Sequence, residues 1–146
     1  MKKQITTTVA TLSLFIVLAA IGFAGLGTKV TADIPFDFAV NGKTLAAGKY
    51  DVTNGAAPGS VIIRNQDTGS AAVVIVRKED AKQIGKAQLT FHRYGNKYFL
   101  DSVNDGQHIS ELLKSSAERK AARGADNLAN NKIKPEIVSV NATVGQ

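Results

Sequence analysis

The feature of this chain that most restricts its fold is an unbroken alternation of apolar and polar residues in KVTADIPFDFAV, residues 29–40. Successive side chains of an extended strand point to opposite faces, so this pattern gives one apolar face and one polar face. Pro35 cannot donate a backbone hydrogen bond, and we therefore expect a bend, a bulge or a sheet edge there. The run predicts a β-rich fold. The apolar face consists of Val30, Ala32, Ile34, Phe36, Phe38 and Val40.

Turn residues divide the following chain into short extended segments. Asn41-Gly42 is typical of a tight β-turn, and QDTG separates two apolar runs as the turn of a second hairpin would. The second of these runs, residues 70–78, is almost continuously apolar and rich in valine, which predicts a central strand buried on both faces. Residues 79–86 are predicted to form a polar loop, and residues 104–107, NDGQ, another turn.

The most conspicuous segment is FHRYGNKYFL, residues 91–100, which carries four of the nine aromatic side chains. A two-residue turn at Gly95-Asn96, with glycine first as type II′ turns prefer, makes this segment a hairpin. Its register places the Arg93 guanidinium over the ring of Tyr98 as a cation–π pair. A hairpin with cross-strand pairs accounts for the clustering of aromatic and charged residues in this segment. The hairpin face directed away from the core is a candidate binding patch. That patch consists of His92, Tyr94, Lys97 and Phe99.

The C-terminal part changes character and carries helix signals. Ser115 and Glu118 have the spacing of a capping box, and Gly124 is a typical helix end, so a short helix is predicted near residues 115–123. Residues 124–146 are interpreted as a connector followed by either a last strand or a flexible tail. The predicted fold is all-β: a small antiparallel barrel or sandwich of about six to eight strands over residues 28–123, with one short C-terminal helix.

The N-terminal segment has the composition of a secretory signal peptide over residues 1–24. Lys2 and Lys3 precede an apolar stretch at residues 9–23, and small residues follow it. We expect cleavage after Ala24, with Ala32 as an alternative site; the other interpretation is an uncleaved membrane anchor, since a span needs about 20 residues. The protein is therefore predicted to be exported, to the periplasm or beyond, and to contact the membrane only through this segment if it stays uncleaved.

The amino-acid composition and the absence of known motifs exclude several classes of function. The chain has no cysteine, which excludes disulfides, thiolate catalysis and cysteine-based metal sites. Residues 25–146 keep 16 of the 18 Lys and Arg and all 12 Asp and Glu, a net charge of +4 spread along the chain. No P-loop and no G-x-S-x-G occurs, and His92 and His108 are the only histidines. We accordingly predict no catalytic residue, metal or cofactor, and two outward rings give little support for nucleic-acid binding.

Two segments also carry a family resemblance. ADIPFDFAVNGKTLAAGKYDV and LTFHRYGNKYFL, followed by a basic helical stretch, resemble an uncharacterised family of small exported bacterial proteins. The similarity covers residues 28–123. It implies a signal peptide, an apolar first strand, a glycine before Tyr50 and the Arg-Tyr-Gly turn, and it implies no activity, cofactor or catalytic residue.

These observations predict an exported, non-catalytic binding or structural module, associated with the cell envelope or secreted. Its expected partner is an envelope polymer, a glycan or a protein. One alternative is a carrier that holds a small apolar ligand inside the barrel, and another is a hydrolase without a recognisable motif. In the carrier hypothesis the interior is lined by Ile34, Phe36, Phe91 and Leu100.

Overall fold

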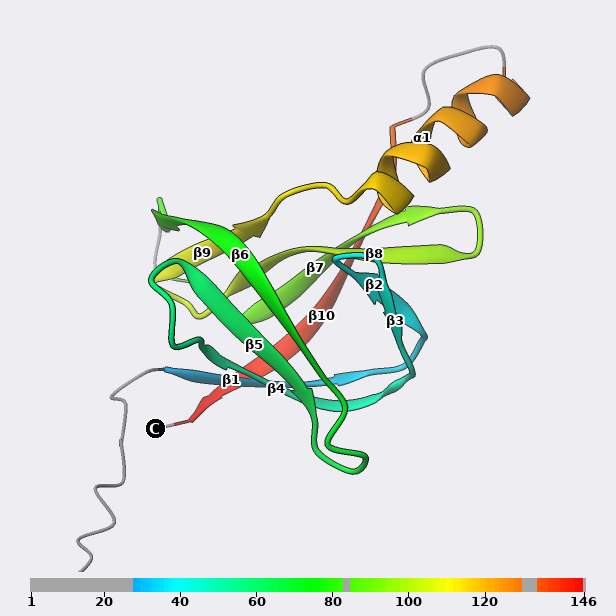
Figure 1. Ribbon diagram of the computed structural model, residues 1–146. Coiled ribbons are helices and arrows are strands. Elements are labelled where there is room, and N and C mark those ends of the chain that lie inside the picture. The colour runs from blue at the N-terminus through cyan, green and yellow to red at the C-terminus, as the bar shows by residue number, and fades with distance from the viewer. Residues whose placement is uncertain (1–27, 83–84, 130–133, 146) are drawn as a thin grey trace, which may run out of the picture.

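The computed structural model describes residues 28–82, 85–129 and 134–145 as ten strands and one helix (Figure 1). The predicted signal peptide and its first cleavage site lie outside these residues. The strands are β1 (Lys29–Ile34), β2 (Phe38–Val40), β3 (Lys43–Leu45), β4 (Gly48–Asn54), β5 (Ser60–Asn65), β6 (Ala71–Asp80), β7 (Gln88–Tyr94), β8 (Lys97–Asn104), β9 (His108–Leu112) and β10 (Glu136–Gly145). The helix α1 spans Ser116–Ala129.

Eight of the strands close into an antiparallel barrel in the order β8-β7-β10-β1-β4-β5-β6-β9, and β9 pairs back to β8. The hairpin β2–β3 is added outside this ring, with β2 parallel to β8. The prediction of a small all-β barrel with one C-terminal helix is confirmed. Closure matters physically because it removes most of the unpaired strand edges that would otherwise invite aggregation.

The last strand is part of the barrel wall. β10 lies between β1 and β7, with Ala142 opposite Ala32 and Val140 opposite Leu89 (Figure 1). Within the segment interpreted as a connector followed by a last strand or a tail, residues 136–145 form this strand. The alternative cleavage site after Ala32 falls inside β1, where cleavage would remove most of that strand.

The alternating run at the start of the domain spans two strands. β1 ends at Ile34, the chain bends over residues 35–37, and β2 resumes at Phe38. The even-numbered residues stay on the core side through the bend. Ile34 and Phe38 are therefore both fully buried, and Phe36 is half-buried. The bend at Pro35 follows the expectation that this residue interrupts the strand.

β6 corrects one prediction. The run of valines predicted a strand buried on both faces, but burial alternates over residues 71–76 and residues 77–80 are exposed. Val74 faces the core, whereas Val73 and Ile75 are 60% and 61% exposed. Continuous apolar runs are typical of strands covered on two sides. Here the helix lies over the β7–β8 hairpin instead, so the outer face of β6 carries apolar side chains that stay in solvent (Figure 1).

Asp51 of β4 ties its strand to β1 and to the β5–β6 turn. Its carboxylate accepts hydrogen bonds from Thr31 Oγ1 at 2.7 Å and Gln66 Nε2 at 2.8 Å, and Lys29 Nζ lies 3.6 Å away. Burial alone would raise the pKa of Asp51, but these donors and the Lys29 charge together hold it below its ordinary value. The ionised carboxylate therefore stabilises the fold above the unfolded-chain pKa of about 3.9, and this contribution is lost as pH falls below it.

We expect Asp51→Asn to reduce stability at neutral pH and to flatten the acid limb of the pH–stability profile, because the variant has no carboxylate to protonate. Urea midpoints measured from about pH 7 down to about pH 2 test this. The matched control is Asp67→Asn, at an exposed position in the β5–β6 turn. An acid limb as steep in the Asp51 variant as in the unmodified protein would contradict the assignment.

Candidate functional site

The candidate site begins with the β7–β8 hairpin, whose predicted register is confirmed. Arg93 lies opposite Tyr98 and His92 opposite Phe99. Gly95 has a φ of 62° and Asn96 a φ below zero, as a type II′ turn requires. The Arg93 guanidinium carbon lies 5.4 Å from the centre of the Tyr98 ring, so the predicted cation–π pair is present.

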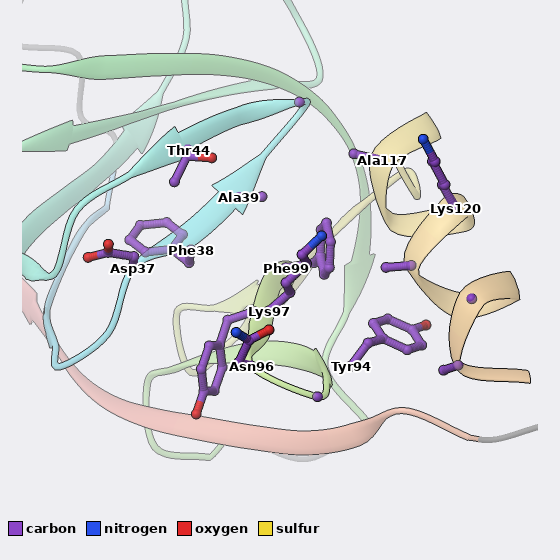
Figure 2. A pocket seen from close by; sticks show the side chains of 16 residues that line it. Asp37, Phe38, Ala39, Thr44, Tyr94, Asn96, Lys97, Phe99, Ala117 and Lys120 are labelled. Atoms are coloured by element: carbon purple, nitrogen blue, oxygen red, sulfur yellow. The ribbon is translucent and has the colours of Figure 1, made fainter. Parts of the chain in front are cut away.

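Helix α1 covers the outer face of this hairpin. The Tyr94 and Phe99 rings lie between the strands and the helix and point toward it (Figure 2). Tyr94 is 7% and Phe99 5% exposed. The expectation that both rings are exposed on an outer face is wrong, because two-residue periodicity within one hairpin cannot show that a later segment returns to cover it. Lys97 is exposed, as expected.

A buried polar contact fixes the start of α1 to the hairpin. Ser115 Oγ accepts the backbone N–H of Glu118 at 3.1 Å, which is the first half of the predicted capping box. The Glu118 carboxylate does not return to the helix start. It lies 2.8 Å from His92 Nδ1 and is only 3% exposed. The register shift at Thr90 leaves Asp101 as an extra residue, and its carboxylate lies 3.4 Å from the same His92 nitrogen.

We expect Glu118→Ala to release α1 while leaving the barrel folded, since a hydrogen bond involving a charged group contributes about 1.5–3 kcal/mol and the helix otherwise meets the hairpin through small residues. Amide exchange in residues 116–125 should accelerate, and exchange in β1 and β4 should not. Glu118→Gln, which keeps one oxygen acceptor, should have a smaller effect. Unchanged exchange in the helix of the alanine variant would show that the contact does not anchor α1.

Gly124 does not end the helix, contrary to the sequence prediction. Helix-ending glycines adopt positive φ, whereas Gly124 lies within α1 and is not among the glycines with positive φ. α1 continues to Ala129. A Cβ built on Gly124 would meet no atom within 4 Å, so the missing side chain leaves open space beside the helix.

That open space belongs to a groove of about 790 Å³ between α1 and the two hairpins (Figure 2). Small residues of α1 form one wall, and the β2–β3 hairpin with the tip of β7–β8 forms the other. Lys97 and Lys120 supply cationic groups, and the Asp37 carboxylate accepts the Ala47 N–H at 2.9 Å. The lining residues are Asp37, Phe38, Ala39, Gly42, Thr44, Tyr94, Gly95, Asn96, Lys97, Tyr98, Phe99, Ala117, Lys120, Ala121, Gly124 and Ala125.

Most residues singled out from the sequence meet in this groove. Three of the four patch residues line it, together with the turn Gly95-Asn96 and Tyr98. His92 holds the helix instead, and Arg93 forms an ion pair with Glu136 of β10 at 3.1 Å. Sequence reasoning missed the opposite wall: Ala117, Ala121 and Ala125 recur at helical spacing, but nothing in the sequence says which strand they face.

The hydrolase alternative requires a histidine within hydrogen-bond reach of a nucleophile or a carboxylate, and both histidines lie beside carboxylates. His92 faces Glu118 and Asp101, and His108 lies 3.4 Å from Asp105 and 3.8 Å from Asp80. A serine-type triad needs a hydroxyl hydrogen-bonded to the imidazole, and among the described residues no serine or threonine hydroxyl bonds either ring. Within the same ranges no group of three or more histidine, aspartate or glutamate side chains is placed to hold a metal ion.

The barrel interior, proposed above as a ligand chamber, is occupied by side chains. Ile34 and Phe91 are fully buried, and the Phe91 ring meets those of Phe36 and Phe38 at 5.1 and 5.4 Å between centres. A cavity of about 20 Å³ at one end, lined by Val30 and Val103 among others, is large enough for a water molecule only.

In residues 28–82, 85–129 and 134–145 no helix is both long and apolar enough to cross a membrane. Comparisons with protein-family models, with curated proteins and with solved structures give no match. The groove between α1 and the two hairpins is therefore the feature from which a function is inferred.

Proposed function

We propose that the protein is an exported, non-catalytic binding module that holds a polypeptide segment of an envelope or secreted protein in the groove between α1 and the two hairpins. The observation that supports this most is the groove itself: about 790 Å³, open to solvent, with an apolar lining and two lysines. Ligand-binding sites are typically concave, largely apolar and supplied with a few charged groups.

The chemistry of the walls favours a polypeptide over a glycan. Sugar rings stack on exposed aromatic faces, but Tyr94 and Phe99 are almost completely buried, and Tyr98 stacks on Phe36 at 3.9 Å between ring centres. The walls instead offer alanine methyl groups and the backbone of the Gly95-Asn96 turn. Such a surface suits a segment with apolar side chains, and Lys97 and Lys120 favour acidic residues within it.

A groove-filling substitution tests the proposal. Ala121→Trp should abolish retention of the partner from a detergent extract of the envelope by the immobilised protein, whereas Ala56→Trp, in the exposed β4–β5 loop, should not. Protease treatment of the extract should abolish retention, and glycosidase treatment should leave it unchanged. Retention that survives Ala121→Trp in a folded variant, or that glycosidase removes, would refute a polypeptide ligand in the groove.

A carrier of a small apolar ligand is the second candidate, favoured by the closed eight-stranded barrel, an architecture that can hold one small molecule. It requires the interior side chains to rearrange, since Phe91 and its neighbours fill the space. Mass spectrometry of natively purified protein distinguishes the two: a bound small molecule whose loss leaves envelope-protein retention unchanged would assign the barrel a separate carrier role.

A further inference from the structure

One strand of the barrel wall keeps an open edge over half its length. β5 pairs with β6 at Ala71–Ile75, and β9 pairs with the other side of β6 only at Val76–Asp80. Beyond Leu112 the chain leaves the wall toward α1. No strand in the described part of the chain pairs with this second side of Ala71–Ile75, which we call the β6 open edge.

The backbone groups on the open edge can be assigned. The N–H groups of Asn65 and Val76 bond across the β5–β6 ladder, to Ser70 and Gly59 respectively, so even-numbered residues of β6 direct their backbone groups toward β5. Odd-numbered residues direct theirs the other way. Ala71 confirms this, since its carbonyl accepts a hydrogen bond from Lys43 Nζ of β3 at 2.8 Å. The backbone groups of Val73 and Ile75 therefore face the open edge, available to an added strand.

β3 lies on the far side of the edge. It is the terminal strand of the sheet order and, among the strands that the structure describes, it pairs with β2 alone. Its Lys43 Nζ donates a hydrogen bond to the Ala71 carbonyl of β6 at 2.8 Å, so this side chain reaches from β3 to the open edge.

The side chains around the edge define the chemistry of an occupant. Val73 and Ile75 project outward beside it, and Leu113, which directly follows β9, is 70% exposed. Two exposed lysines flank the edge: Lys43 at one end, and Lys114, next to Leu113, at the other. An apolar strip between two cations complements an extended segment that alternates apolar and acidic residues.

The nearby carboxylates do not cancel these lysines. The Asp51 carboxylate is already bonded to Thr31 and Gln66, with Lys29 Nζ 3.6 Å away. Glu111 lies opposite Arg77 in the β6–β9 register. The positive charges of Lys43 and Lys114 also disfavour a second copy of this chain as the segment that binds the open edge. Pairing two open edges across a two-fold axis would bring the lysines of both copies together.

We propose that the β6 open edge binds an acidic, extended polypeptide segment by strand addition, in line with β9 and between β6 and β3, as a recognition surface separate from the groove. Backbone hydrogen bonds to Val73 and Ile75 set the register of the bound segment, and the outward apolar side chains of β6 provide contact area. On binding, the Lys43 ammonium moves from the Ala71 carbonyl to a carboxylate of the segment. This surface does not depend on the proposed role of the groove.

The probe is a short amidated peptide that alternates glutamate and valine, with a lysine–valine peptide as its basic twin. Amide exchange in the full protein should slow about tenfold or more at Val73 and Ile75 when the acidic peptide binds, and should not change with the basic peptide. Lys43→Glu should reverse this preference. Val73→Pro removes the edge N–H and should abolish protection of Ile75, whereas Val73→Thr should keep it.

Each outcome decides the proposal. Absence of slowing at Val73 and Ile75 with saturating acidic peptide overturns it, and so does equal slowing with both peptides. Slowing that appears without peptide and grows with protein concentration would assign the edge to self-association instead. If Val73→Pro does not fold, Lys43→Glu still tests the proposal, because this variant should prefer the basic peptide. Ala121→Trp, which blocks the groove, should leave this peptide binding unchanged, so failure of one site is distinguishable from failure of the other.

Discussion

A chain truncated after Pro135, which lacks β10, is expected not to fold. Among the strands that the structure describes, β7 pairs with β8 and β10 alone, and β1 pairs with β4 and β10 alone. Its loss therefore opens the barrel, leaves two long unpaired edges and uncovers the core residues Leu89 and Phe91. Because a small domain has only about 5–15 kcal/mol of net stability, the loss of a whole wall strand exceeds what the fold can tolerate.

Circular dichroism and thermal unfolding of the truncated chain measure this effect. A pair of point variants gives the matched control: Val140→Asp places a charge opposite Leu89 on the core side, whereas Ser139→Asp places it on the exposed side of the same strand. The first should be strongly destabilising and the second nearly neutral. A truncated chain that still unfolds cooperatively near the midpoint of the full protein would contradict the barrel closure described above.

Phe91→Ala is expected to cost about 3–5 kcal/mol, the usual range for deleting a buried phenylalanine ring. Phe91 has no exposed surface, and its ring forms T-shaped pairs with the rings of Phe36 and Phe38, which link the end of β1 and the start of β2 to the core. The cavity left behind lies between several strands that pair with one another, so the wall cannot collapse to fill it without breaking the register.

Phe99→Ala is the matched comparison for this substitution. Phe99 is also buried, but it lies between the outer face of β8 and α1 (Figure 2). Its deletion should loosen the helix and cost less global stability. Urea unfolding of the two variants gives the difference, and a Phe91 variant that is as stable as the Phe99 variant would refute the assignment of Phe91 to the centre of the core.

Much of the wall could be predicted from the sequence because strand and turn signals are local. Alternation at residues 29–40 fixed which side chains are buried, and Gly95-Asn96 fixed the register of four cross-strand pairs. Burial of β6 could not be inferred in the same way. Whether Val73 and Ile75 are covered depends on where a helix packs, and a run of valines carries no information about that.

The site was accessible to sequence reasoning only in part. The hairpin residues Tyr94, Lys97 and Phe99 were singled out, and all three line the groove. Their partners come from β2–β3 and from α1, which lie far away in sequence, and the contact that places α1 joins His92 to Glu118 across 26 residues. Glu118 matched a capping box, and this local interpretation concealed its long-range role.

Site-specific photo-crosslinking tests the central claim, that the groove is the binding surface, most directly. A photoreactive residue at Thr44, which is exposed and lines the groove, should give one dominant protein adduct in the envelope, and Ala121→Trp should suppress it. The same residue at Thr68, in the exposed β5–β6 turn, should give none. Equal adducts from both positions, or a Thr44 adduct that persists in the Ala121 variant, would contradict the account.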